Sequence, residues 1–187
     1  MESGTHFVTF RLGDSLPQSA LAKLEHEAGR IAGDDKDEKK KALLRQIEKY
    51  LDRGIGACHL SKLEITEMVA AAIHRLDGRM YRLIAWVVMP NHVPLVVRVL
   101  PGEKLSSVLH SLKSFTAKEA NRILKRRGSF WQREYYDHLV RTPDGFQKAV
   151  NYVLNNPLKA GLKDWNWVGS CGPEAHSTAG GDAGATL

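Results

Sequence analysis

The chain has 187 residues, a formal net charge of +6 and a hydrophobic content of 43%. This length predicts one domain that buries a real core, and no apolar run approaches the roughly 20 residues that would cross a membrane. The N-terminus lacks the basic and apolar regions of a signal peptide, and the two cysteines form no CxxC pair. We therefore expect a cytoplasmic protein.

The positive charge is concentrated in the second half of the chain. Residues 101–163 carry 12 Lys and Arg against 5 Asp and Glu, whereas the rest of the chain carries 15 against 16. Such a local excess suits a polyanionic partner. A solvated basic face would give the same count, so charge alone leaves both interpretations open.

The first half of the chain predicts a strand followed by helices. An alternating run over 6–12 is typical of a strand. Helical composition follows over 18–31 and 37–51, and the Asp34–Lys41 run, with acids first and lysines after, indicates the start of a solvated helix. A turn at 53–56 precedes residues 63–76, whose apolar side chains recur at helical spacing.

The second half predicts a strand pair and two more helices. Strands over 80–88 and 93–100 flank the short segment 89–92, which implies an antiparallel pair. A helix over 105–125, an extended aromatic-rich segment over 130–141 and a helix over 144–155 that ends before Pro157 follow. The Gly/Ala-rich residues 169–187 predict a disordered tail behind a domain of residues 1–168. This order favours an α+β fold with helices packed on an antiparallel sheet.

Three segments could carry chemistry. His92 starts an apolar strand beside a turn, and Tyr152 and Asn156 are four residues apart on one helix face. Residues 130–141 interleave aromatic and charged side chains, which can stack on and pair with single-stranded nucleic acid. Each feature taken alone is more often structural, and we expect Trp86 and Trp131 in the core.

In their order along the chain, four segments resemble the REP-associated tyrosine transposases, which are HUH-type relatives of insertion-sequence transposases with one catalytic tyrosine. The segments are His6-Phe-Val-Thr-Phe-Arg-Leu-Gly-Asp-Ser-Leu-Pro17, Ala85-Trp-Val-Val-Met-Pro-Asn-His-Val93, Phe130-Trp-Gln-Arg-Glu-Tyr-Tyr-Asp-His138 and Tyr152-Val-Leu-Asn-Asn-Pro-Leu-Lys-Ala-Gly-Leu162. The resemblance spans roughly residues 5–168. It implies a ferredoxin-like, RRM-like sheet with helices on one face.

The resemblance also implies a metal-dependent tyrosine site. Tyr152 matches the nucleophile, and His92 and Asn156 match two ligands of a divalent metal, Mg²⁺ or Mn²⁺; no nucleotide cofactor is implied. The family's second histidine falls at Pro94, which cannot bind a metal, and His138 is a candidate replacement. Because proline lacks an N–H group, Pro94 should lie at a sheet edge, at a bulge or among the first residues of its strand.

The activity implied is DNA transposition by a bacterial, nucleoid-associated monomer or homodimer. It would bind single-stranded or hairpin DNA of the REP type, and would nick and join that strand through a 5′-phosphotyrosine. The candidate DNA contacts are Lys113, Lys118, Arg122, Lys125, Arg126, Arg127, Arg133, Tyr135 and Tyr136. Pro94 leaves open a catalytically silent DNA-binding protein, and an RNA-binding module is open by fold analogy alone.

Overall fold

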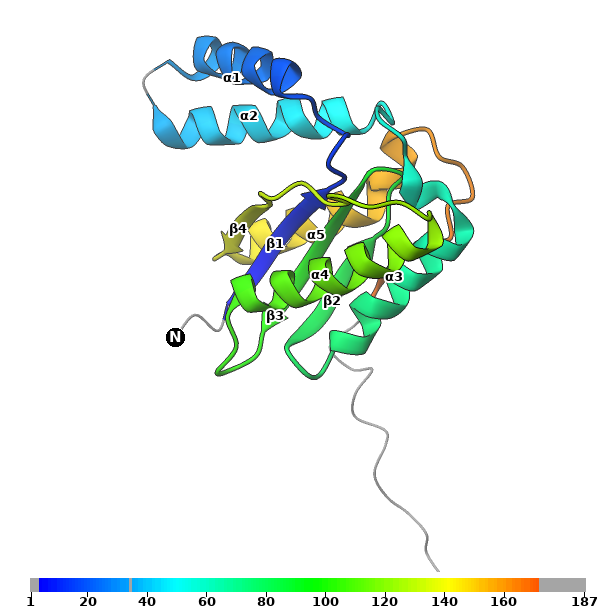
Figure 1. Cartoon of the computed structure of the whole chain (residues 1–187). Helices are drawn as coiled ribbons and strands as arrows, with labels where there is room; N and C mark the ends of the chain where they lie inside the picture. The colour runs from blue at the N-terminus through cyan, green and yellow to red at the C-terminus, as the bar shows by residue number, and fades with distance from the viewer. Residues whose placement is uncertain (1–3, 34, 172–187) are drawn as a thin grey trace, which may run out of the picture.

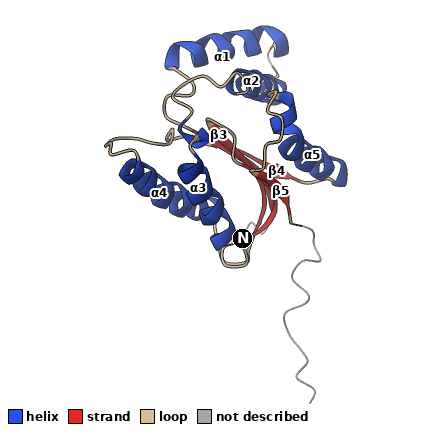
Figure 2. Ribbon diagram, turned by 90° about the vertical axis from the view of Figure 1, so that its right-hand side faces the viewer, coloured by secondary structure: helices blue, strands red, loops and turns tan. Residues whose placement is uncertain are grey.

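Five strands form one sheet, and helices cover both of its faces (Figures 1 and 2). The structure is a computed structural model that describes residues 4–33 and 35–171. The elements are β1 (Thr5–Arg11), α1 (Gln18–Ala32), α2 (Lys36–Leu51), the short 3₁₀ helix η1 (His59–Ser61), α3 (Leu63–Leu76), β2 (Tyr81–Val87), β3 (His92–Val99), α4 (Leu105–Ile123), β4 (Tyr136–Val140), α5 (Pro143–Lys159) and β5 (Val168–Ser170).

The sheet has the order β4-β1-β3-β2-β5, and every neighbouring pair is antiparallel. This confirms the expected α+β fold, and its first four strands have the ferredoxin-like order. In the register of the two central strands, His92 lies opposite Arg11 and Pro94 opposite Thr9. Pro94 is the third residue of β3, and the ladder with β2 reaches only to Leu95. Proline therefore falls near the start of the strand, as expected.

The helices divide between the two faces of the sheet, so the expected placement on one face is wrong. Val8, Phe10, Val93 and Leu95 face α3 and α4 in the larger core. Phe7 and Val96 point the other way and pack against Val153 of α5. The physical reason lies in β1 and β3 themselves, which are buried along nearly their whole length. A strand that is apolar on both sides needs cover on both faces.

Helices α1 and α2 form an antiparallel hairpin that extends from the end of β1 (Figure 1). Helix α1 packs on α2, and α2 lies between α1 and the rest of the domain (Figure 2). The Asp34–Lys41 run was predicted as a solvated helix start, and the described side chains of the first turns of α2 are exposed. Its last turns are half-buried, because they lie beside α5.

Two further boundaries differ from the sequence predictions. Helix α5 continues through Pro157 to Lys159, because both Asn156 and Pro157 are buried and only the last turn loses a backbone hydrogen bond. Residues 168–170, where the tail was predicted to start, form β5 against β2. The rest of the predicted tail, residues 172–187, lies outside the described residues. Trp131 is buried, as expected, and Trp86 packs partly buried on the core.

None of the helices within the described residues is both long and apolar enough to pass through a membrane.

Candidate active site

His92 is completely buried, and its neighbour fixes the state of its ring. The amide nitrogen of Asn91 donates to the backbone oxygens of Leu51 (3.0 Å) and Ile55 (3.1 Å), which turns its oxygen toward His92 Nδ1 at 2.7 Å. Because that oxygen can only accept, Nδ1 carries the proton and Nε2 keeps its lone pair. Burial lowers the pKa of His92 to about 3, so the ring is neutral at physiological pH.

Nε2 of His92 is buried and has no hydrogen-bond partner in the described structure. A buried, unprotonated nitrogen without a partner is costly in a core, and it is the atom with which a neutral histidine binds a metal. Pro94 follows two residues later on the same face of β3, at the position where the resemblance implies a second histidine.

Tyr152 lies on α5 at the edge of the same face. Its ring meets Phe7 of β1 edge to face, with the ring centroids 5.3 Å apart, and the Lys159 ammonium lies 5.0 Å from the Tyr152 ring centroid. The hydroxyl is buried without a hydrogen bond of ordinary geometry. Desolvation, and then the carboxylates of Glu48 and Asp52, raise the pKa of Tyr152 above its usual value.

Asn156 projects inward one helical turn beyond Tyr152. Its side chain is 1% exposed, and neither its amide oxygen nor its amide nitrogen has a partner within the described residues. The amide is close enough to the Tyr152 hydroxyl to act on its pKa. Leaving both ends of a buried amide unpaired costs several kcal/mol by the usual scale of roughly 1–3 kcal/mol for each group.

The atoms without hydrogen-bond partners in His92 and Asn156 indicate whether these residues could bind a divalent cation. The described residues contain no group of three or more His, Cys, Asp or Glu side chains placed to hold a metal. His92 Nε2 and Asn156 Oδ1 are nevertheless buried, lone-pair-bearing and unpartnered, which are the properties expected of metal ligands. The residues therefore fit a weak site of two protein ligands, completed by water or phosphate oxygens.

A cleft of about 360 Å³ opens beside Tyr152. Phe7 and the half-buried Tyr136 of β4 form part of its wall, and His138 of β4 reaches the same cleft from the sheet edge, where it lies opposite Phe7. His138 is exposed. It therefore shares the cleft with the tyrosine, whereas the strand register places His92 opposite Arg11, at the far end of β1.

Helix α2 supplies the opposite wall of this cleft, which the sequence analysis did not anticipate. Lys41, Leu44, Arg45 and Glu48 line it. The charge count had placed the basic excess in the second half of the chain, yet two of these cations come from the first half. The spacing could have predicted that these side chains share one face of a helix, because Lys41, Arg45 and Glu48 recur at helical intervals beside the apolar Leu44.

Glu48 is an ionisable group beside Tyr152 whose pKa is shifted by this arrangement. Burial raises its pKa to about 7, against the opposing influence of the Tyr152 hydroxyl, and Asp52 raises it further. Lys159 and Arg45 act in the opposite direction. Near neutral pH, a half-buried carboxyl that is only partly ionised thus lies next to the candidate nucleophile.

We expect Glu48→Gln to stabilise the fold at high pH. The folded-state pKa is raised above the unfolded value of 4.5 to about 7. The folded state therefore binds the proton more tightly, and stability falls as pH rises from about 4.5 to 7. The variant should exceed the wild type in free energy of unfolding by about 2–3 kcal/mol at pH 8 and match it at pH 4. Urea unfolding at the two pH values measures the difference.

The control is Glu38→Gln, which removes an exposed carboxylate that pairs with Lys41 on the same helix. It should change stability by less than about 1 kcal/mol at either pH. Equal stabilities of Glu48→Gln and wild type at pH 8 would show that the Glu48 carboxyl is not held in a desolvated place.

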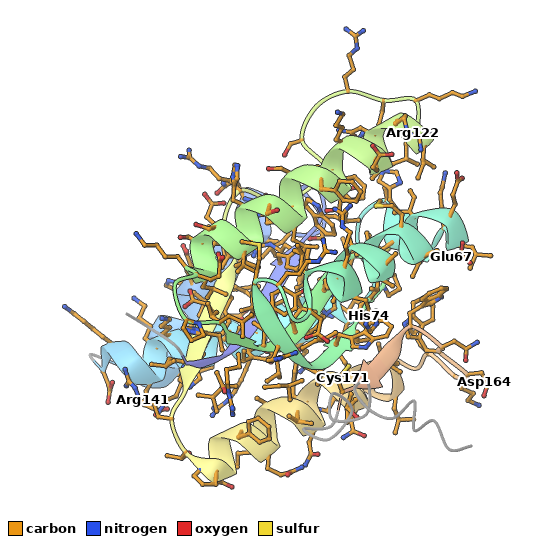
Figure 3. The ribbon with its side chains drawn as sticks, turned by 90° about the horizontal axis from the view of Figure 1, so that it is seen from below. Glu67, His74, Arg122, Arg141, Asp164 and Cys171 are labelled. Carbon is orange, nitrogen blue, oxygen red and sulfur yellow. The ribbon has the colours of Figure 1, made fainter. Side chains whose placement is uncertain are left out.

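The predicted DNA contacts do not all have free side chains. Lys113 donates to the backbone oxygens of Gln132 and Arg133, both at 2.8 Å, and so holds the segment after α4. Arg126 contacts His59 Nε2 and Ser129 O, each at 3.0 Å. Arg122 pairs with Glu119 and lies near the end of α4 (Figure 3). The exposed cations of the set are Lys118, Arg122, Lys125, Arg126, Arg127 and Arg133.

Tyr135 and Tyr136 are separated by the sheet. Tyr135 belongs with Lys113, His110 and Arg133 to a second groove of about 400 Å³ between α4 and residues 128–135. Tyr136 belongs to the Tyr152 cleft. Tyr135 precedes β4 and packs against the larger core, whereas Tyr136 packs against the smaller core on the other face, so the two tyrosines line different grooves.

A known protein family matches the part of the chain that contains the candidate site. The model of the family described as "Transposase IS200 like" matches residues 59–156, just over half of the chain. This chain belongs to that family. The matched residues include His92, Tyr152 and Asn156, whereas α1 and α2 lie before them.

Named relatives of this IS200-like chain agree with the resemblance found in the sequence. A REP-associated tyrosine transposase of Escherichia coli K12 is 27% identical over 105 residues, which cover 53% of this chain and 61% of that protein. A Haemophilus influenzae protein that carries the same name in provisional form is 25% identical over 115 residues, covering 54% of this chain and 65% of its own length. The matches thus span less than two thirds of these relatives.

The fold comparison extends further along the chain. The solved structure of a REP-associated tyrosine transposase bound to a REP hairpin matches with a TM-score of 0.54 and 17% identity, covering 90% of this chain and 77% of that one. At this identity the match shows a shared fold. The family assigned from the four sequence segments and the α+β fold are both confirmed.

Proposed function

We propose that this protein nicks single-stranded DNA beside a hairpin and rejoins the ends through a covalent link to Tyr152. The observation that carries the proposal is the grouping of a buried, unpartnered tyrosine hydroxyl with Asn156 on α5, on the sheet face that His92 also occupies. Membership of the transposase family and the hairpin named for the solved relative support the same DNA chemistry.

The chemistry exchanges one phosphodiester for another. The Tyr152 hydroxyl loses its proton to solvent as its oxygen attacks the scissile phosphorus, and the 3′-oxygen takes up a proton as its bond to phosphorus breaks. The 5′-phosphate is then joined to the tyrosine, and a free 3′-OH is left. A 3′-OH attacking the phosphotyrosine reverses these bond changes and releases the tyrosine. The phosphodiester energy is retained, so the reaction needs no nucleotide cofactor.

In this proposal each group of residues in the site has a separate role. His92 and Asn156 would hold a divalent cation, Mg²⁺ or Mn²⁺, which when bound polarises the scissile phosphate and offsets its developing charge. The Phe7 edge and the Val153 packing fix the direction of the Tyr152 ring. The Lys159 ammonium lies 5.0 Å from the centroid of that ring, and Lys41, Arg45 and Lys148 line the cleft where a DNA strand would pass.

Pro94 supports a second candidate, a DNA-binding protein that does not cut. With one histidine fewer, the cation could be bound too weakly for catalysis. A nicking assay separates the candidates: a hairpin-bearing single strand is incubated with Mg²⁺ or Mn²⁺, and a covalent protein–DNA adduct is sought by denaturing electrophoresis. An adduct excludes the silent protein. Salt-dependent binding with no adduct, even at millimolar Mn²⁺, would overturn our proposal.

We expect the exposed cations of α4 to act through the DNA backbone. Replacing Lys118 and Arg122 with Gln should weaken hairpin binding at 50 mM salt. It should also reduce the slope of log K against log salt by roughly 0.7–0.9 for each phosphate that the variant no longer neutralises. Fluorescence anisotropy over a salt series measures both effects. The matched control, Lys23→Gln on exposed α1, should leave the slope unchanged, and an unchanged slope in the α4 variant would remove this helix from the interface.

A further inference from the structure

The strand β4 contributes side chains to both faces of the sheet. It is the outermost strand on its side and pairs with β1 (Figure 1). Tyr136 lines the Tyr152 cleft on one face. Asp137 lies opposite Val8, which belongs to the larger core on the face that α4 covers, and Tyr135, just before the strand, packs on that core as well. Neighbouring residues at this edge of the sheet thus reach both faces.

Two hollows on the α4 face meet at Tyr135. One is the groove of about 400 Å³ between α4 and residues 128–135. The other is a cavity of about 730 Å³ beside the first turn of α4, which we call the His6 cavity; its lining includes His6, Asp137 and the loop that leads into α4. Tyr135 and Ser106 line both hollows, so the groove and the cavity adjoin along α4.

The two hollows differ in charge. Lys113 and Arg133 line the groove, and none of the described residues that line it is a carboxylate. The His6 cavity is lined by the carboxylates of Glu103 and Asp137 and by one cation, Lys104. A phosphodiester is attracted to the cations and repelled by the carboxylates, whereas a carboxylate can accept a hydrogen bond from the amino group of a base. This division suits a nucleotide whose phosphate lies in the groove and whose base lies in the cavity.

His6 and Tyr135 also suit a base. Only 4% of His6 is exposed, and its Nδ1 has no hydrogen-bond partner within the described residues. Buried polar groups of this kind normally have partners, so a polar ring in the wall of a cavity favours a guest that can form hydrogen bonds. Tyr135 is half-buried, and the Lys113 ammonium lies 5.8 Å from its ring centroid. Aromatic side chains beside cations are the usual platform on which unpaired bases stack.

We propose that an unpaired base of the DNA binds in the His6 cavity against Tyr135, and that the strand passes over the edge of β4 between this cavity and the Tyr152 cleft. The inference rests on the proposed function, because it concerns the same DNA strand. The bound base carries an exocyclic amino group, since the carboxylate of Asp137 can only accept a hydrogen bond. Holding one base on the α4 face fixes which phosphate of the strand reaches Tyr152 on the other face.

The test is an abasic scan of a DNA hairpin with unpaired cytidine flanks, in which fluorescence anisotropy measures binding to the full chain. In the wild type, removal of one base should weaken binding at least about fivefold at one unpaired position. In Tyr135→Leu, which keeps an apolar side chain against the core, the same removal should change the dissociation constant less than about twofold. The matched control is Tyr50→Leu on α2, which lines neither hollow and should keep the wild-type penalty.

A second variant tests the carboxylate and does not depend on core packing, because Asp137 is exposed. At the sensitive position, wild type should bind cytosine about 2–10-fold more tightly than thymine, which has no amino group. Asp137→Ala should lose this preference. Glu67→Ala removes an exposed carboxylate from α3 (Figure 3) and should keep it. Urea unfolding of each variant shows that it is folded.

Three results would overturn the inference: a wild type without an abasic penalty at any unpaired position, a Tyr135→Leu protein that keeps the penalty, or a wild type that binds thymine as tightly as cytosine. The proposed function is scored separately, as the covalent adduct formed with Mn²⁺. An adduct together with any of these results leaves the nicking function intact. A penalty that depends on Tyr135 but comes without an adduct would retain the base-binding cavity and reject nicking.

Discussion

Tyr152→Phe should abolish the covalent adduct and reduce nicking by at least about 10⁴-fold, the scale of loss when a nucleophile is removed. The variant lacks only the oxygen that would attack the phosphorus. Its ring can keep the edge contact with Phe7, so the position of α5 against the sheet should not change. The hydroxyl makes no ordinary hydrogen bond, and its removal should therefore leave the fold as stable as before or slightly more stable.

Two measurements accompany this experiment. Hairpin binding by Tyr152→Phe should match the wild type within about threefold, because the phosphate contacts that dominate affinity lie elsewhere. Tyr50→Phe, on the α1–α2 hairpin and outside the Tyr152 cleft, should nick normally. Persistence of the adduct in Tyr152→Phe would assign the nucleophile to another tyrosine, of which Tyr136 in the same cleft is the first to examine.

Strands and helices could be predicted from the sequence where apolar side chains recur with the spacing of a strand or of a helix. The strands at 81–87 and 92–99 and the helix at 63–76 were placed to within a few residues, because alternation and helical spacing are local signals. The end of α5 was predicted wrongly because it depends on more than a local signal. Pro157 is a local stop signal, and it was overridden because burial of Asn156 and Pro157 against the sheet is a tertiary effect.

The candidate site was predictable only where it lies in a contiguous motif. His92, Tyr152 and Asn156 could be aligned with a known family, but Glu48 could not, since it lies on α2, before the matched residues 59–156, in a helix with no motif of its own. Asn91 stood in the motif beside His92, yet its role depends on Leu51 and Ile55, some 40 and 36 positions away. Long-range contacts of this kind have no signature in a single sequence.

Buried polar atoms without hydrogen-bond partners lower the stability of the fold, and in this site they belong to the residues proposed to act on DNA. His92, Tyr152 and Asn156 each keep a buried polar atom unpaired, and so do Thr9 and Arg11 on the neighbouring strand β1. Natural cores rarely retain such atoms without a use for them. Removal of a site residue should therefore cost ligand binding far more than it costs folding, and His92 is the residue for which this contrast can be measured best.

His92→Ala should lower Mn²⁺ affinity and nicking by at least about 100-fold, since it removes a ligand rather than a group that supports one. The same variant should change the response of the metal-free protein to acid. In the wild type the pKa of His92 is lowered from 6.5 to about 3, so the unfolded state takes up a proton that the folded state refuses. Stability from this source is present above pH 6.5 and is lost as pH falls toward 3.

Between pH 7 and pH 5 the wild type should lose about 2 kcal/mol through His92, and His92→Ala should not lose this amount. Urea unfolding in the presence of a chelator measures the slope, and His26→Ala on α1 is the control because that ring is exposed. The deletion leaves a cavity beside Asn91, which lowers stability equally at both pH values and does not alter the comparison. Parallel acid curves for wild type and His92→Ala would mean that folding does not lower the pKa of His92, which would contradict a fully buried ring without a charged partner.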